Sequence, residues 1–214
     1  MPDSRKPIAI FPARMYNRKQ YAGRVRMLRT AEEKDEEMNK FIGHLGTVCR
    51  HRHKVFVHCV RAGIPLRGLL HDLSKFSPAE FIPGVKNWQG TRSPNETERE
   101  KYGYSRAWMH HKGRNLHHYE YWNDFNPKTR QVEPVKMPPV YFAEMFCDRV
   151  AASKTYQGKN YTDAHPLEYF RRGRPHMFIH EETAAALEKV LTVLAEEGED
   201  AAFALVREIV KNGY

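Results

Sequence analysis

The chain has 214 residues, of which 41% are hydrophobic and 12% aromatic, enough for one packed domain but too few for two of ordinary size. The many Tyr, Phe and Trp argue against disorder, and no apolar run approaches the roughly 18 residues of a membrane span. Three cysteines without a CxxC spacing, and the lack of an apolar stretch after the first basic residues, predict reduced thiols in a cytoplasmic protein that is neither secreted nor membrane-bound.

Basic residues outnumber acidic ones, 35 to 26, and the formal net charge of +9 favours anionic partners. Much of this surplus lies in residues 1–29, which contain eight Lys and Arg against one Asp, together with three Pro. Two interpretations of this basic N-terminal arm stay open. It is either a partly disordered, solvated tail or an arm that contacts nucleic acid. Residues 30–214 are expected to form the folded domain.

Helices are expected in succession after residue 30. The sequence Thr-Ala-Glu-Glu at 30–33 resembles a capped helix start, and a longer helical segment is expected over about 41–62, ending at Gly63-Ile64-Pro65. The next helix is expected from about Leu66 and includes the doublet His71-Asp72.

The rest of the chain follows the same pattern of helices and loops. We expect a helix start at 77–80, loops at 83–97 and 124–137, and helices at about 95–112, 138–156, 181–197 and 199–211. Neither an alternating strand pattern nor an internal repeat is found in the sequence. The predicted fold class is therefore all-α, with a single domain.

Three of the twelve histidines mark the inward face of the helix predicted at 41–62. His44, His51 and His58 are seven residues apart and share a stripe with Val48 and Val55. Seven residues of helix rise by roughly 10 Å, so at most one of the three can ligate a given ion. The other two then need ordinary hydrogen-bond partners.

The doublet His71-Asp72 lies between the apolar residues Leu70 and Leu73. Neighbouring side chains on a helix diverge by about 100°, so a buried His-Asp pair is costly unless something compensates the carboxylate. A divalent metal ion would do so, because imidazole and carboxylate are both good ligands for such ions. The alternative is that Asp72 caps a helix.

With His51, the segment 68–75 that contains His71-Asp72, and a lone inward Asp on a later helix, the chain resembles the HD-domain superfamily of metal-dependent phosphohydrolases. In that superfamily a His, a His-Asp doublet and a distant Asp, all on helices, bind the metal. In the segments 71–80, 110–122 and 144–154 the chain resembles more closely an uncharacterised bacterial and phage family of HD-like proteins that has no agreed activity. This closer resemblance extends from about residue 40 over most of the chain and implies an HD-like helical bundle.

The metal ligands that the resemblance implies are His51, His71, Asp72 and Asp148. Independent support exists for Asp148, which shares one helical face with Tyr141 and Met145 and therefore points toward the apolar side. A carboxylate there needs a cation, which is either the metal or an arginine. The expected cofactor is a divalent transition metal (Mn, Fe, Co, Ni or Zn), with one or two ions.

A second histidine group comprises His110, His111, His117 and His118. On one straight helix these doublets are too far apart for one ion, but Gly113 is expected to break the helix and fold them together. Three interpretations stay open. The histidines ligate a second ion; they contact phosphate, act as a general acid or orient other ligands; or they have no function.

The favoured function is that of an enzyme, a metal-dependent phosphohydrolase acting on a nucleotide or related phosphoester. A bound ion polarises the phosphoryl group and turns water into a hydroxide nucleophile, and Lys75, one helical turn beyond Asp72, would act beside it with the second histidine group. The further residues expected to bind the anionic substrate are Lys112, Arg114, Asn115, Arg149 and Lys154. The alternatives are an HD-like di-iron oxygenase and a nucleic-acid-binding or interaction protein with a structural metal.

Overall fold

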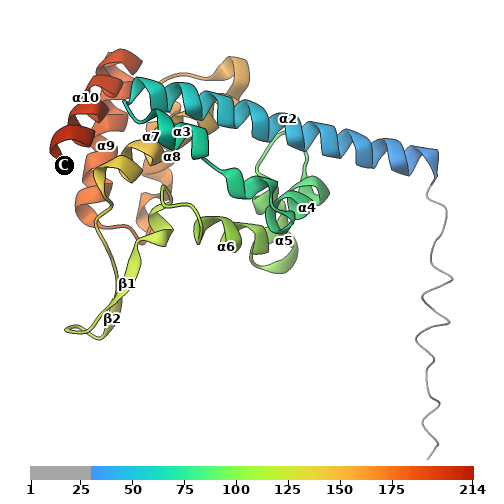
Figure 1. The fold of residues 1–214 in the computed structure, drawn as a ribbon, viewed down its shortest axis with the longest axis horizontal. Helices are drawn as coiled ribbons and strands as arrows, with labels where there is room; N and C mark the ends of the chain where they lie inside the picture. The colour runs from blue at the N-terminus through green and yellow to red at the C-terminus, as the bar shows by residue number, and fades with distance from the viewer. Residues whose placement is uncertain (1–29) are drawn as a thin grey trace, which may run out of the picture. The chain divides into compact units, whose positions relative to one another are not determined.

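The computed structural model describes residues 30–214, and the predicted basic arm at 1–29 lies outside them. Within the described range the protein is all-α, with nine α-helices, a few short 3₁₀ turns and one two-stranded hairpin (Figure 1). The helices are α2 (Ala31–Arg61), α3 (Pro65–Leu70), α4 (Pro78–Asn87), α5 (Pro94–Tyr102), α6 (Arg106–Lys112), α7 (Pro139–Gln157), α8 (His165–Gly173), α9 (Glu181–Glu197) and α10 (Glu199–Asn212). Residues 37–214 pack as one unit, which confirms the single all-α domain.

Helix α2 is longer than expected, because the two predicted helical segments at its start are continuous. Thr30 and Glu33 form a capping box: the Glu33 N–H donates to Thr30 Oγ1 (3.2 Å), and the Thr30 N–H donates to Glu33 Oε2 (2.9 Å). The predicted inward face is confirmed, since His44, His51 and His58 are all buried.

The tight turn predicted at 63–65 is present, with Gly63 at φ 78° and α3 beginning at Pro65. A Cβ atom at Gly68 would lie 2.6 Å from Cβ of Cys59, so only glycine allows α3 to pack this closely on α2. The expectation that His71-Asp72 is helical is wrong. Helix α3 ends at Leu70, and Asp72 adopts the left-handed conformation (φ 54°) before the 3₁₀ turn η1 (Leu73–Phe76).

Two other helices differ from the prediction. Helix α4 continues through Pro83 to Asn87, because a proline removes only one backbone hydrogen bond, so the predicted loop begins later. The expected helix at 95–112 is two helices, separated by Gly103 (φ 80°) and by a new cap at Ser105, whose Oγ accepts from the Trp108 N–H. As predicted at Gly113, α6 ends at Lys112.

The predicted loop at 124–137 contains a short hairpin, and helix α8 was not predicted. Strands β1 (Asn123–Asn126) and β2 (Gln131–Pro134) pair antiparallel, with four residues each. Four residues are too few for an alternating pattern to stand out in a sequence. The loop prediction was therefore wrong only for the seven strand residues that lie within 124–137.

The apolar core lies mainly between α7, α9 and α10, which contact one another. Phe142, Phe146 and Phe203 are buried there together with Leu187 and Leu191. In α7 every residue from 142 to 147 is buried, so this helix is held on several sides and its polar residues have fixed positions. Among residues 30–214, none of the helices has the length and apolar character needed to cross a membrane. The cytoplasmic location stays a prediction.

Candidate metal centre

Five segments of the chain bring histidines and carboxylates to one place. Helix α2 provides His51, the turn after α3 provides His71 and Asp72, and α7 provides Asp148. Helix α6 provides His111, and the segment before the 3₁₀ turn η2 (Tyr119–Tyr121) provides His117 and His118. The four ligands implied by the resemblance are therefore adjacent, and three histidines of the second group lie beside them.

The first group of donors consists of His51, His71 and Asp148, with Asp72 at its edge. The Nε2 atoms of His51 and His71 lie 3.0 and 3.7 Å from Asp148 Oδ1. Asp72 Oδ2 lies 3.3 Å from His71 Nε2 and 4.0 Å from His51 Nε2. These atoms surround a space of the size that one ion takes.

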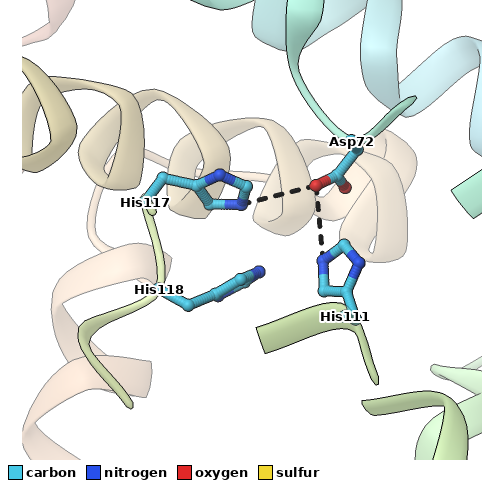
Figure 2. Close-up of side chains that lie close together, drawn as sticks. All are labelled: Asp72, His111, His117 and His118. Atoms are coloured by element: carbon cyan, nitrogen blue, oxygen red, sulfur yellow. Dashed lines mark ion pairs between the residues drawn. The ribbon is translucent and has the colours of Figure 1, made fainter. Parts of the chain in front are cut away.

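The second group consists of His111, His117 and His118 around the other oxygen of Asp72. Asp72 Oδ1 lies 3.3 Å from His111 Nε2 and 3.4 Å from His117 Nε2. The ring of His118 is 4.1 Å from that of His117 between centroids, and Figure 2 shows all four side chains pointing toward one another. Because its two oxygens face different groups, Asp72 is shared between them.

The unpartnered atoms of this cluster are those that a metal would need. Among the side chains of this cluster, five buried atoms that could ligate a metal have no hydrogen bond of regular geometry: Nε2 of His51, His71, His117 and His118, and Oδ1 of Asp72. Buried polar atoms are normally paired, because each unpaired one costs roughly 1–3 kcal/mol. Imidazole nitrogens and carboxylate oxygens suit divalent first-row metals, so these buried groups can hold a metal ion.

Glu144, which the sequence analysis missed, orients two of the histidines. Its Oε1 accepts from His71 Nδ1 (3.0 Å) and lies 3.3 Å from His117 Nδ1, while Arg67 donates to Oε2 at 2.7 Å. Burial raises the pKa of Glu144, but the hydrogen bonds from His117 and His71 outweigh it, and the pKa falls to about 2. The ionised carboxylate thus fixes both rings through Nδ1, so that each Nε2 points toward the other donor atoms, where a bound cation would displace any proton it carries.

Glu80 does the same for the second group. Its Oε2 accepts from His111 Nδ1 at 2.7 Å, and its Oε1 accepts from His110 Nδ1 at 2.6 Å. His110 therefore faces Glu80 and is not among the converging donors. Asn115 supports the same region by donating to His111 O and to Ser74 Oγ, both at 2.8 Å.

Lys75 reaches the centre, as the sequence predicts. Its Nζ lies 2.8 Å from Asp72 Oδ2. Burial raises the pKa of Asp72, but His71 and Lys75 hold the pKa well below its ordinary value, so Asp72 is ionised. Burial likewise lowers the pKa of Lys75, but Asp72 outweighs it and the pKa is raised, so Lys75 is charged.

A cavity of about 570 Å³ opens onto these residues, all of them within the unit 37–214. Arg149, next to Asp148 on α7, lines this cavity, and its Nε is buried without a hydrogen-bond partner among the described residues. Aromatic side chains from Trp108, Tyr119 and Tyr156 also line the walls. The cavity thus combines the donor cluster, cationic groups and flat apolar surfaces.

Four of the five predicted substrate-binding residues do not line this cavity: Asn115 contacts His111 and Ser74, and the other three lie elsewhere. Lys154 pairs with Glu199 and lies 3.4 Å from His58 Nε2, at the junction of α2, α7 and α10. Arg114 is exposed and Lys112 is half-buried, and neither lines the cavity. Their role in binding a substrate stays a prediction.

The missed carboxylates had only weak signals in the sequence. Glu144 is four residues before Asp148 and so shares its helical face, a spacing that indicates a joint site. Glu80 sits in the first turn of a helix, where acidic residues are common for another reason.

Comparison with known proteins identifies a family but no function. Residues 40–193 match the model of a family of unknown function, DUF5662. No curated protein matches the chain, and no solved structure matches it.

Proposed function

Since the chain belongs to the DUF5662 family, whose function is unknown, we propose its activity from the site alone: it is a metal-dependent phosphohydrolase acting on a nucleotide or related phosphoester. We also propose that it is a member of the HD-domain superfamily. The observation that carries both proposals is the meeting of His51, the doublet His71-Asp72 and Asp148 around atoms that lack protein partners.

Two ions fit the donor set better than one. His51, His71 and Asp148 would hold the first ion, and the His111, His117 and His118 imidazoles would hold the second. Asp72 would bridge them, because its Oδ2 faces the first group and its Oδ1 the second. Divalent ions bound there would supply Lewis-acid polarisation of a phosphoryl group and activation of water.

Lys75 and Arg149 supply the positive charge that the phosphate of a substrate requires. Lys75 is charged and lies at the edge of the donor cluster, and Arg149 lines the cavity. Guanidinium and ammonium groups bind phosphoryl oxygens and stabilise the charge that develops during transfer. A cavity of about 570 Å³ is within the usual range for small-molecule sites, and its aromatic walls suit a nucleobase.

The test combines metal analysis with a substrate panel. We expect the purified protein to contain two equivalents of a divalent transition metal per chain and to release phosphate from at least one nucleotide or phosphoester. Asp72→Ala should lose both properties, whereas Asp124→Ala, at an exposed hairpin position, should keep both. Fully loaded protein that leaves the whole panel unchanged would contradict the phosphohydrolase assignment.

One observation favours a second candidate function, that of a di-iron oxygenase. Such a site needs six protein ligands, and the two groups with Asp72 offer seven. Iron-loaded protein that consumes O₂ with an organic substrate, and releases no phosphate from the panel, would favour it. The nucleic-acid alternative depends on residues 1–29, so steeply salt-dependent DNA or RNA binding that requires those residues is its test.

A further inference from the structure

Trp108 on α6 contacts both the second donor group and an arginine that the sequence analysis did not select. Its indole ring lies 4.7 Å from the ring of His118 and 5.6 Å from the ring of His111, measured between centroids. From α5, the guanidinium carbon of Arg99 lies 5.5 Å from the centroid of the same indole. All four side chains line the cavity that opens onto the donor cluster. The indole thus connects Arg99 to two of the three histidines that would hold the second ion.

A buried carboxylate, that of Glu98, fixes α5 against α6 beside this pair. Its Oε2 accepts from Ser105 Oγ at 2.6 Å and from the Ala107 N–H at 3.3 Å. Ser105 Oγ in turn accepts from the Trp108 N–H at 3.0 Å. Because Glu98 directly precedes Arg99, these hydrogen bonds join the turn of α5 that carries Arg99 to the first turn of α6. The fold itself therefore brings the guanidinium to the indole.

The charge of Arg99 is available to a ligand. Arg92, another cation on the cavity wall, is paired with Glu100 through both of its terminal nitrogens. Arg99 is exposed, and its side chain forms no ion pair or hydrogen bond with the residues that the structure describes, 30–214. Stacking on an aromatic ring orients a guanidinium but leaves its N–H groups free to donate to an anion.

We propose that Arg99, held by Trp108, binds a second phosphate group of the substrate, next to the phosphoryl group that the ions would hold. This inference rests on the proposed function and narrows it, since phosphoesters with two adjacent phosphate groups become the favoured substrates. Because 4.7 and 5.5 Å are both measured to the indole, the guanidinium lies no farther than about 10 Å from the His118 ring. A diphosphate bound to the second ion at one end can reach Arg99 with its other end, where a guanidinium binds phosphate oxygens through paired N–H groups. Trp108 is then a positioning residue, because it acts through Arg99.

The first experiment measures binding without turnover, by calorimetry on the full chain loaded with metal. The probes are methylenediphosphonate and methylphosphonate, which carry two phosphonate groups and one, and which contain no phosphoester bond. Arg99→Gln should lower the affinity for the diphosphonate by about tenfold and leave the affinity for methylphosphonate unchanged, because only the longer probe reaches the guanidinium. The matched control is Arg106→Gln, at an exposed arginine of α6 that does not line the cavity, and it should change neither affinity.

The second experiment tests whether Trp108 positions Arg99. Trp108→Leu should lower the affinity for the diphosphonate about as much as Arg99→Gln does, because an aliphatic side chain offers the guanidinium no aromatic face. Trp108→Phe keeps such a face and should retain the native affinity to within about threefold. In the chain that carries both Trp108→Leu and Arg99→Gln the two losses should not add, since both changes remove one contact. Metal analysis at saturating metal should find the native number of ions in each variant.

The outcomes distinguish this inference from the proposed function. Arg99→Gln that keeps the native affinity for the diphosphonate, or that loses equal affinity for both probes, would overturn the inference alone. Trp108→Phe that binds the diphosphonate as weakly as Trp108→Leu would overturn the positioning role of the indole. Binding of neither probe by the fully loaded native chain would overturn the inference together with the phosphohydrolase assignment.

Discussion

The two donor groups of the metal centre are carried by different kinds of structure. In the first group His51 and Asp148 project from α2 and α7, of 31 and 19 residues, and α7 is buried on several sides; only His71 lies outside a helix, in the turn after α3. The second group depends on the seven-residue helix α6 and on the irregular segment that holds His117 and His118. Donors on long, packed helices are already in place before an ion arrives, whereas short segments must be ordered on binding. We therefore expect the first ion to bind more tightly than the second.

Removing the shared ligand should have the largest effect. Asp72→Ala takes one donor from each group and leaves Lys75 without its partner, so both ions should be lost. We expect phosphatase activity to fall by at least about 1000-fold, since the activation of water depends on the ions. Metal analysis and phosphate release measure the two effects. Retention of one ion in Asp72→Ala would show that the carboxylate is not shared.

The two carboxylates that orient the histidines, Glu144 and Glu80, differ in which donor group they contact. Glu144 contacts a histidine of each group, His71 and His117, whereas Glu80 contacts only His111 of the second group among the donors. Glu144→Gln should lower the affinity for both ions by about 10–100-fold, and Glu80→Gln should lower the affinity for the second ion alone by a similar factor. Metal titration of both variants by calorimetry distinguishes these outcomes. If both variants lowered the affinity for both ions equally, this assignment of Glu144 to both groups and Glu80 to the second would be wrong.

Acid should destabilise the packing of α2 against α7, the two helices that carry His51 and Asp148. His58 joins α2 to α7: its Nδ1 donates to Cys147 O at 3.2 Å, and burial lowers its pKa from 6.5 to about 4. The unfolded chain takes up this proton more readily, so the stabilisation is complete above pH 6.5 and is lost as the pH falls toward 4. Between pH 7 and pH 5 the loss is about 2 kcal/mol.

Urea unfolding of metal-free protein at the two pH values measures this loss. His58→Gln should lose less stability between pH 7 and pH 5 than the native chain, by about that amount. His53→Gln, at an exposed position of the same helix, is the matched control and should retain the native pH dependence. A native dependence in His58→Gln would show that other groups govern acid unfolding.

The sequence predicted the placement of the first donor group better than that of the second, for a physical reason. Helical periodicity places His51 and Asp148 on inward faces, and Gly63 and Gly113 mark where helices end. The left-handed conformation of Asp72 is not visible in the sequence, because non-glycine residues rarely adopt it and contacts distant in sequence must impose it. The roles of Glu80 and Glu144 depend on approaches across 31 and 73 positions, which local patterns do not encode.

The smallest expected effects come from two arginines, one that lines the cavity and one that lies outside it. Arg149 lies on α7 and lines the cavity, and Arg114 is exposed just past α6. Arg149→Ala should raise KM for the phosphoester by about tenfold, the value of one charge-assisted hydrogen bond. Arg114→Ala should leave kcat and KM unchanged, with metal content equal to the native protein in both variants. If Arg114→Ala raises KM as much as Arg149→Ala does, the segment after α6 closes onto the substrate, and the looser half of the centre takes part in binding it.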